Sequence, residues 1–135
     1  SALSLLGVKG VDLGIEDAPE RDYVKLRGGR VLFGDPLSDP ETLEALTREL
    51  EHRIPPGAHV IAPLGVGWHI DHLLTYQAAR NLKRASTWYY EDTPYNWIPS
   101  QKRLRLGVSA EDRVLFLQEF FQAQYVKSWL SSWSK

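Results

Sequence analysis

Hydrophobic residues recur every three or four positions between residues 38 and 54, and this spacing predicts an amphipathic helix there. Its apolar face is formed by Leu43, Leu46, Leu50 and Ile54. The run Ser38-Asp39-Pro40-Glu41 has the residues of a capping box, with proline in the first turn, so the helix should begin at this run. Pro55-Pro56-Gly57 should end it.

Two short apolar segments flank a second predicted helix. Residues 58–62 are apolar and partly β-branched, which is typical of a buried strand in a parallel sheet. Residues 69–83 have apolar positions at helical spacing, namely Leu73, Leu74, Ala78 and Leu82. Residues 86–90 are a further strand candidate. Because strands and helices alternate, the sequence predicts an α/β domain with a largely parallel sheet flanked by helices.

The two ends of the chain carry weaker patterns. Residues 1–8 are typical of the end of an apolar helix that Gly7 stops. Residues 8–15 suit a short strand that runs into a loop at residues 16–19, and residues 20–37 should be mostly loop. After residue 94 the chain should be irregular until Ser109, where a last helix begins. The apolar members of that helix are Val114, Leu117, Phe120, Phe121 and Tyr125.

The composition limits the classes of protein that fit. The 135 residues suit one domain spanning residues 1–135, and a net charge of -1 gives no field that would attract nucleic acid or anionic lipid. No apolar run reaches the ~20 residues that a membrane-spanning helix needs. We therefore expect neither a nucleic-acid nor a membrane partner, and a cytoplasmic protein by default. Without cysteine, the strong metal ligands available are His, Asp and Glu.

Half of the four histidines lie in the run His69-Ile70-Asp71-His72, which follows the predicted strand 58–62. Ligands of α/β folds bind beyond the carboxyl ends of the strands, so this run is well placed for a site, as is Glu16-Asp17 after the first predicted strand. On a helix, His69 and His72 would share a face with their β-carbons about 5–6 Å apart. A neighbouring carboxylate can fix the tautomer of a catalytic or metal-binding imidazole. The alternative is that Asp71 caps the helix and both histidines are surface residues.

Two motifs in the chain are similar to motifs of a known family. The run I-A-P-L-G-V-G-W-H-I-D-H (residues 61–72) and the run W-Y-Y-E-D-T-P-Y (residues 88–95) resemble the PIG-L or LmbE-like zinc-dependent N-deacetylases. Weaker matches at residues 5–8, 13–18 and 122–125 extend the resemblance over nearly the whole chain. The resemblance implies a Rossmann-like fold in which zinc activates water to remove the N-acetyl group of an amino sugar or glycoconjugate.

The resemblance also assigns roles by position in the motif. It makes His72 a zinc ligand and places His69 near the acyl oxygen, where it would polarise that oxygen or protonate the leaving amine. Asp71 would support the imidazole of His69, and Arg21 and Asp17 match the part of the family that touches substrate. The His-Pro-Asp-Asp run that supplies two zinc ligands and the carboxylate base in the family does not occur here, and the chain contains no methionine. We therefore expect an N-terminal strand and most of a helix to be absent, and this chain alone to lack deacetylase activity.

Several features keep other interpretations open. Glu91 and Asp92 could orient a site histidine or cap a turn, and the basic run at residues 102–105 should be solvated surface. The aromatic cluster is formed by Trp88, Tyr89, Tyr90, Tyr95 and Trp97. One alternative is a non-catalytic α/β module that binds a carbohydrate or a partner through this cluster, and another is a metal site that His59 or Asp17 completes. A homo-oligomer is also possible, because a truncated sheet would expose an unpaired edge or an apolar face.

Overall fold

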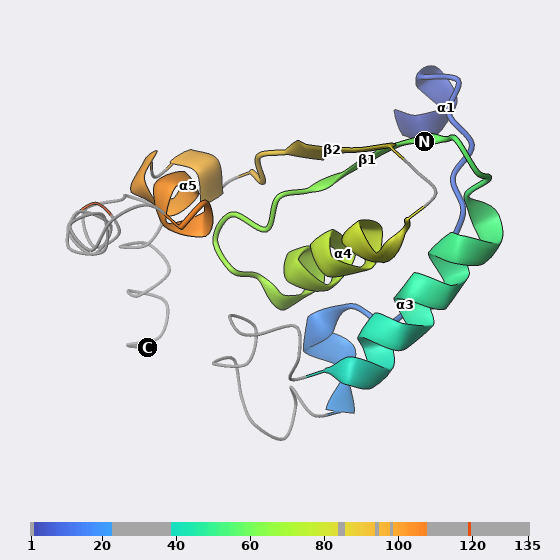
Figure 1. Cartoon of the computed structure of the whole chain (residues 1–135), viewed down its shortest axis with the longest axis horizontal. Helices are drawn as coiled ribbons and strands as arrows, with labels where there is room; N and C mark the ends of the chain where they lie inside the picture. Colours follow the sequence, from blue (N-terminus) through green and yellow to red (C-terminus); the bar gives the residue numbers. More distant parts are fainter. Residues whose placement is uncertain are drawn as a thin grey trace.

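The fold is built on a two-stranded parallel sheet, as the computed structural model in Figure 1 shows. Strand β1 (His59–Pro63) pairs with β2 (Ser86–Tyr90), and helix α4 (Ile70–Asn81) lies between them in the sequence. The structure describes residues 2–22, 39–83, 86–93, 95–97, 99–107 and 119. Within these residues the chain is a mixed α/β fold with a small parallel sheet flanked by helices, so the predicted fold class is confirmed at this level.

Helices cover one side of the sheet in two layers. Helix α4 packs on β1, and α3 (Pro40–Arg53) packs on α4. The core lies where these two helices meet the N-terminal segment, and it contains Ala18, Leu46, Ile70, Leu74 and Ala78. The four apolar positions that predicted the second helix, residues 73, 74, 78 and 82, are all buried. Their burial confirms the predicted helix, which is one to two residues shorter at each end than predicted.

The other side of the sheet is exposed in the described part of the chain. Ile61 and Trp88 are register partners, and their side chains are 74% and 65% exposed. The strand predicted at residues 58–62 is therefore present and parallel, but it is buried only toward its carboxyl end, at Ala62 and Pro63. Alternate residues of a strand point to opposite faces, so Ile61 and Pro63 share one face, which is exposed at Ile61 and covered at Pro63. The prediction of an exposed apolar face agrees with this arrangement.

Helix α3 begins one residue later than the capping-box pattern implies. Asp39 is the N-cap, and its Oδ1 accepts a hydrogen bond from the backbone N–H of Thr42 at 3.2 Å. The predicted box instead made residue 38 the cap and Glu41 its partner. With Asp39 as the cap, Pro40 occupies the first helical position, where its missing N–H costs nothing, and this preference explains the shift. The helix ends at Arg53, before the two prolines, as predicted.

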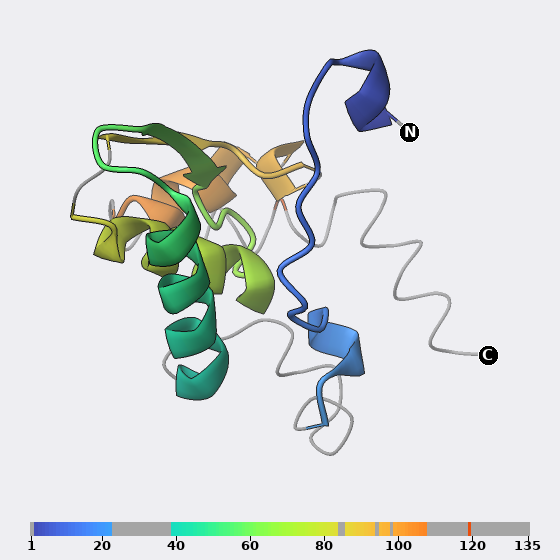
Figure 2. The same cartoon turned by 90° about the vertical axis from the view of Figure 1, so that its right-hand side faces the viewer.

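The N-terminal segment contains one confirmed and one wrong prediction. Helix α1 (Ala2–Leu5) ends in a Schellman motif, in which the N–H of Val8 donates to the carbonyl of Leu3 at 2.9 Å and Gly7 has a φ of 65°. Residues 8–17 are not a strand. They run as an irregular segment toward the 3-10 helix η1 (Ala18–Glu20) (Figure 2). Leu13 and Ile15 of this segment pack against the core. Gly14 has a φ of 65°, which interrupts the extended backbone that a strand needs.

The segment after β2 is more regular than predicted. A 3-10 helix η4 (Tyr95–Trp97) and helix α5 (Pro99–Arg105) occupy residues that should have been irregular. Pro99 at the start and three basic residues in the last turn are the helix signals that the spacing of apolar residues missed. The helix predicted from Ser109 and most of the loop predicted at residues 20–37 lie outside the described residues. In the part of the chain that is described, no helix has the length and apolar character needed to cross a bilayer.

Candidate functional site

The carboxyl ends of both strands meet at a buried carboxylate. Asp92 follows β2, is fully buried, and accepts hydrogen bonds through Oδ2 from the backbone N–H groups of Gly65 and Val66, each at 2.8 Å. Its other oxygen, Oδ1, lies 2.6 Å from Nδ1 of His72. Asp92 therefore connects the segment after β2, the loop after β1 and the first turn of α4. Its placement favours the interpretation that this acidic residue orients a histidine.

The loop between β1 and α4 has a backbone that few residues can adopt. Gly65, Gly67 and Trp68 have φ angles of 79°, 90° and 58°, and the N–H of Trp68 donates to the carbonyl of Gly65 at 3.3 Å. Left-handed conformations are ordinary for glycine but uncommon for tryptophan. This winding turns two consecutive N–H groups inward to Asp92. It also places the next residue, His69, at the N-cap of α4.

Arg105 of α5 holds the same loop from its other side. Its Nε donates to the carbonyl of Leu64 at 2.9 Å, and its guanidinium carbon lies 4.3 Å from the centre of the Tyr76 ring. The ring of Tyr76 in turn contacts that of Tyr89 of β2, with 4.9 Å between ring centres. The expectation that residues 102–105 form only solvated surface is therefore wrong for Arg105, which joins α5 to the loop, to α4 and to β2. This contact could not be predicted from the sequence, because α5 itself was not predicted.

Replacing Gly65 with alanine is expected to lower the free energy of unfolding by about 2–4 kcal/mol. A β-carbon at this position would lie 2.7 Å from Cδ2 of Leu73 and 3.2 Å from Nε of Arg105, in addition to the strain of a positive φ. Gly57 is the matched control, because it has the same φ of 79° with open space around it. Urea denaturation should show a loss of about 1 kcal/mol for Gly57→Ala. Equal losses in the two variants would contradict the close packing at Gly65.

His69 and His72 lie side by side, as their spacing predicts. Their ring centres are 5.2 Å apart, and the two planes are inclined by 49°. Burial lowers the pKa of His69 below its usual value of 6.5, and His72 lowers it further, while the charge of Asp71 acts in the opposite direction. A lowered pKa keeps His69 neutral near pH 7, with one ring nitrogen as donor and the other as acceptor.

Asp71 connects the histidines to the N-terminal segment. Its Oδ2 accepts a hydrogen bond from the backbone N–H of Ala18 at 2.9 Å, and its Oδ1 pairs with the guanidinium of Arg21. Burial by itself raises the pKa of Asp71, but the hydrogen bonds that this carboxylate accepts from Asp17, Ala18 and Arg21 outweigh burial, so its pKa lies below the usual value. The negative charge of Asp71 raises the pKa of His69, and a direct supporting role of Asp71 for the imidazole of His69 stays a prediction from the resemblance.

Arg21 is buried among acceptors of the protein itself. Besides Asp71, its guanidinium pairs with Oδ2 of Asp39 at 3.3 Å and donates to the carbonyl of Glu16 at 3.0 Å. The side chain of Arg21 is only 9% exposed. This geometry favours a positioning role for Arg21, which holds the N-terminal segment against α3 and α4. A direct contact between Arg21 and substrate stays a prediction from the resemblance.

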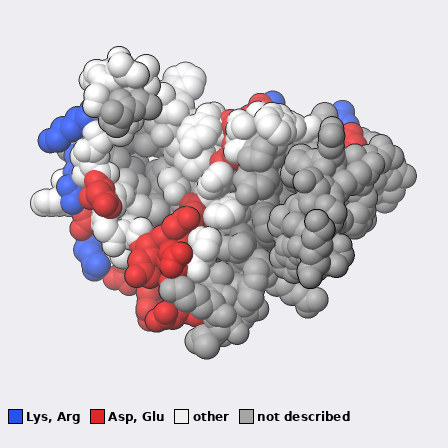
Figure 3. Space-filling model, turned by 180° about the vertical axis from the view of Figure 1, so that it is seen from behind, with Lys and Arg blue, Asp and Glu red and all other residues white. Residues whose placement is uncertain are grey.

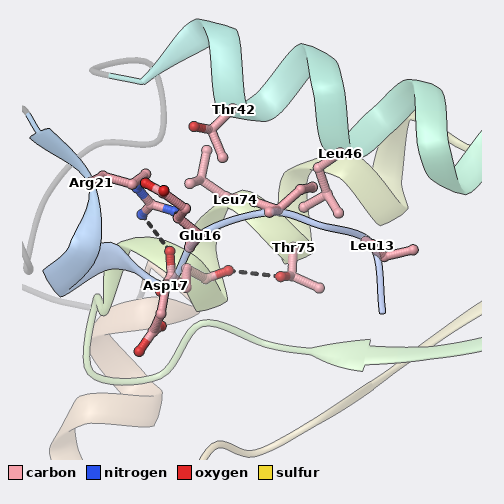
Figure 4. Close-up of a pocket in the computed structure, with 10 residues that line it drawn as sticks. Leu13, Glu16, Asp17, Arg21, Thr42, Leu46, Leu74 and Thr75 are labelled. Carbon is pink, nitrogen blue, oxygen red and sulfur yellow. Dashed lines mark hydrogen bonds and ion pairs between the residues drawn. The ribbon is translucent and has the colours of Figure 1, made fainter. Parts of the chain in front are cut away.

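Asp17 lies beside Asp71 on the exposed side of this network. The pKa of Asp17 is raised because it shares a hydrogen bond with Asp71, and burial and the negative charge of Asp71 raise it further. Asp17 also lines a pocket of about 270 Å³ between α3, α4 and residues 13–21 (Figure 4). The two segments that sequence reasoning proposed for a site, Glu16-Asp17 and the run His69–His72, therefore meet at the Asp17–Asp71 pair.

The described residues fit one zinc ligand and its orienting carboxylate, but not a complete site. With Nδ1 of His72 held by Asp92, Nε2 is the ring nitrogen that would bind a metal, which is the usual arrangement of a metal-binding histidine. No group of three or more His, Asp or Glu side chains within the described ranges could hold a metal ion. His59 lies at the amino end of β1, whereas His69 and His72 follow its carboxyl end, so the strand separates them.

We compared the chain with known protein families, with curated proteins and with solved structures. No family model, no curated protein and no solved structure matches it. The two motifs at residues 61–72 and 88–95 and the geometry around Asp92 are therefore the observations from which a function can be argued.

Proposed function

We propose that this chain belongs to a zinc-dependent hydrolase of the PIG-L or LmbE type, with the Rossmann-like fold of that family, which removes an N-acetyl group from an amino sugar or glycoconjugate. The observation that carries the proposal is the pair formed by His72 and the buried Asp92. The carboxylate of Asp92 is fully buried, is fixed by two main-chain donors and lies 2.6 Å from the imidazole of His72, which is the arrangement that orients a metal-binding histidine. Both residues belong to the two motifs that resemble the family.

In this proposal the residues of the chain have distinct tasks. Asp92 holds the ring of His72 with Nε2 toward the metal, and a bound zinc would supply the activated water that attacks the acyl carbon. His69, neutral because of its burial, lies beside His72. Its ring N–H would polarise the acyl oxygen, or its free ring nitrogen would take up a proton from the attacking water and pass it to the leaving amine. Asp71 and Arg21 fix the first turn of α4 against the N-terminal segment.

The first experiment measures the intact mass of the full-length protein under native and denaturing conditions, with zinc quantified on the same sample. His72→Ala is expected to abolish stoichiometric zinc binding, because it removes the ligand nitrogen that Asp92 orients. His69→Ala should leave zinc in place and lower kcat for an N-acetylated amino sugar by about 10²-fold or more. His52→Ala is the control, since His52 is an exposed residue in the last turn of α3.

Two results would contradict this assignment. Retention of stoichiometric zinc by the His72 variant would remove His72 from the ligand set, and an unchanged kcat in the His69 variant would reject its catalytic role.

A native protein near 15.4 kDa without zinc would instead favour the second candidate function, a non-catalytic binding module. The observation that favours this second function is the exposed apolar face of the sheet, where Ile61 and Trp88 lie side by side.

A further inference from the structure

The pocket between α3, α4 and the N-terminal segment has hydrophobic walls. Leu13 and Ile15 contribute one wall, Leu46 of α3 a second and Leu74 of α4 a third (Figure 4). Its volume of about 270 Å³ exceeds the roughly 150 Å³ of a cavity that accepts benzene. The space therefore suits a compact hydrocarbon group, such as a short alkyl chain or one substituted ring.

The polar part of the pocket has more acidic than basic side chains. Glu16, Asp17 and Asp71 contribute carboxyl groups, two of which share a hydrogen bond, and Arg21 contributes the one guanidinium among the residues that line it. Arg21 also pairs with Asp39, so its charge is already shared between two acids. From behind, a patch of acidic side chains lies on the side of the molecule where η1 and the start of α3 are found (Figure 3).

We propose that this pocket binds a small primary amine, with the hydrocarbon group between Leu13, Leu46 and Leu74 and the ammonium group at Asp17. An ammonium ion supplies the positive charge that the excess of carboxylates lacks, and it donates hydrogen bonds that carboxylate oxygens accept. Asp17 is exposed, so an ammonium group there keeps part of its hydration and loses little free energy through desolvation.

The position of the pocket relates this ligand to the proposed function. Hydrolysis of an amide releases an amine, and Asp71 lines the pocket while it lies in the same helical turn as His72. The inference that the bound amine is the amine released from the substrate by hydrolysis rests on the proposed function. Binding of the amine does not rest on it, because none of the pocket residues named here is a metal ligand in the proposed hydrolase. A metal-free binding experiment therefore tests the pocket separately from the hydrolase.

The test titrates the metal-free full chain with n-hexylamine and, in parallel, with n-hexanol, and follows binding by NMR chemical shifts. We expect the amine to bind about tenfold more tightly than the alcohol at low ionic strength, since the two probes differ mainly in charge. Raising the salt to about 0.5 M should reduce this preference several-fold. Asp17→Asn should abolish the preference and leave the affinity for hexanol unchanged.

A second variant tests the walls of the pocket. Leu13→Trp should weaken binding of both probes because the larger side chain fills the pocket. Val11→Trp is its control, because Val11 is 52% exposed in the same segment and does not line the pocket. Equal affinities for amine and alcohol in the unmodified chain would overturn the proposal, as would binding that Leu13→Trp leaves unchanged. If the unmodified protein binds the amine but shows no zinc-dependent hydrolysis, that result would count against the proposed hydrolase function and not against the pocket.

Discussion

Replacing Asp92 with alanine is expected to lower the free energy of unfolding by about 3–5 kcal/mol. The carboxylate is fully buried, and its removal leaves the N–H groups of Gly65 and Val66 without an acceptor in a region from which water is excluded. It also removes the acid that lies 2.6 Å from Nδ1 of His72. Urea denaturation followed by tryptophan fluorescence measures the loss. Zinc binding, if present in the native protein, should weaken by about 10–100-fold in the same variant.

One further variant separates the buried hydrogen bonds of Asp92 from its charge, and a second serves as the surface control. Asp92→Asn keeps an acceptor oxygen for the two N–H groups, so it should cost less than the alanine variant and still alter the orientation of His72. Glu91→Ala is the neighbouring control, because Glu91 pairs with Lys102 on the surface and should cost less than about 1 kcal/mol. A loss for Asp92→Ala as small as that of the control would show that the buried carboxylate does not hold the loop.

Replacing Arg21 with methionine is expected to lower the free energy of unfolding by about 3–5 kcal/mol at neutral pH. Methionine retains much of the hydrophobic bulk, so the loss reports the charge rather than a cavity. The variant leaves Asp39 buried and Asp71 half-buried without the guanidinium that both contact. Arg53→Met is the matched control, since Arg53 forms an exposed ion pair with Glu49 in α3. Comparable losses in the two arginine variants would contradict the structural role of Arg21.

The cost of Arg21→Met should depend on pH in a defined direction. The pKa of Asp71 in the folded chain lies below its ordinary value of 3.8, so the stability that its ionised form contributes is present above that value and is lost as the pH falls through the folded pKa. The variant raises the pKa of Asp71 and forfeits this contribution. The difference in unfolding free energy between the two proteins should therefore be largest near neutral pH and shrink below pH 3.8. A difference that grows in acid would contradict this sign.

The sequence predicts well those elements in which the regularly spaced apolar residues are also the residues that pack against the rest of the fold. Leu43, Leu46 and Leu50 form the face that α3 turns to α4, and strands β1 and β2 are short β-branched or aromatic runs between turn residues. Residues 8–15 show a strand-like pattern and form no strand, because a strand also needs a hydrogen-bonding neighbour. Helix α5 was missed since its short sequence is mostly polar and its ends, rather than an apolar stripe, define it.

The candidate site shows the same division between local and non-local information. The adjacency of His69 and His72 follows from their spacing on α4 and could be predicted. The partners of the charged groups were predicted only in part, because they come from distant segments. The sequence left open whether Asp92, which follows β2, orients a histidine or caps a turn, and nothing in it indicated that Arg21 pairs with Asp71. The sequence shows which residues have suitable chemistry, but which of them contact one another depends on the three-dimensional path of the chain.

The parallel pairing of β1 with β2 has a consequence for how the site is assembled during folding. Parallel strands cannot be joined by a tight turn, so their pairing waits until the chain has closed a long loop that contains all of α4. His69 and His72 are brought together early, by local helix formation. Asp92 joins them only when β2 docks beside β1, and this non-local step is expected to be the slower one. The orientation of His72 is therefore acquired late, together with the sheet itself.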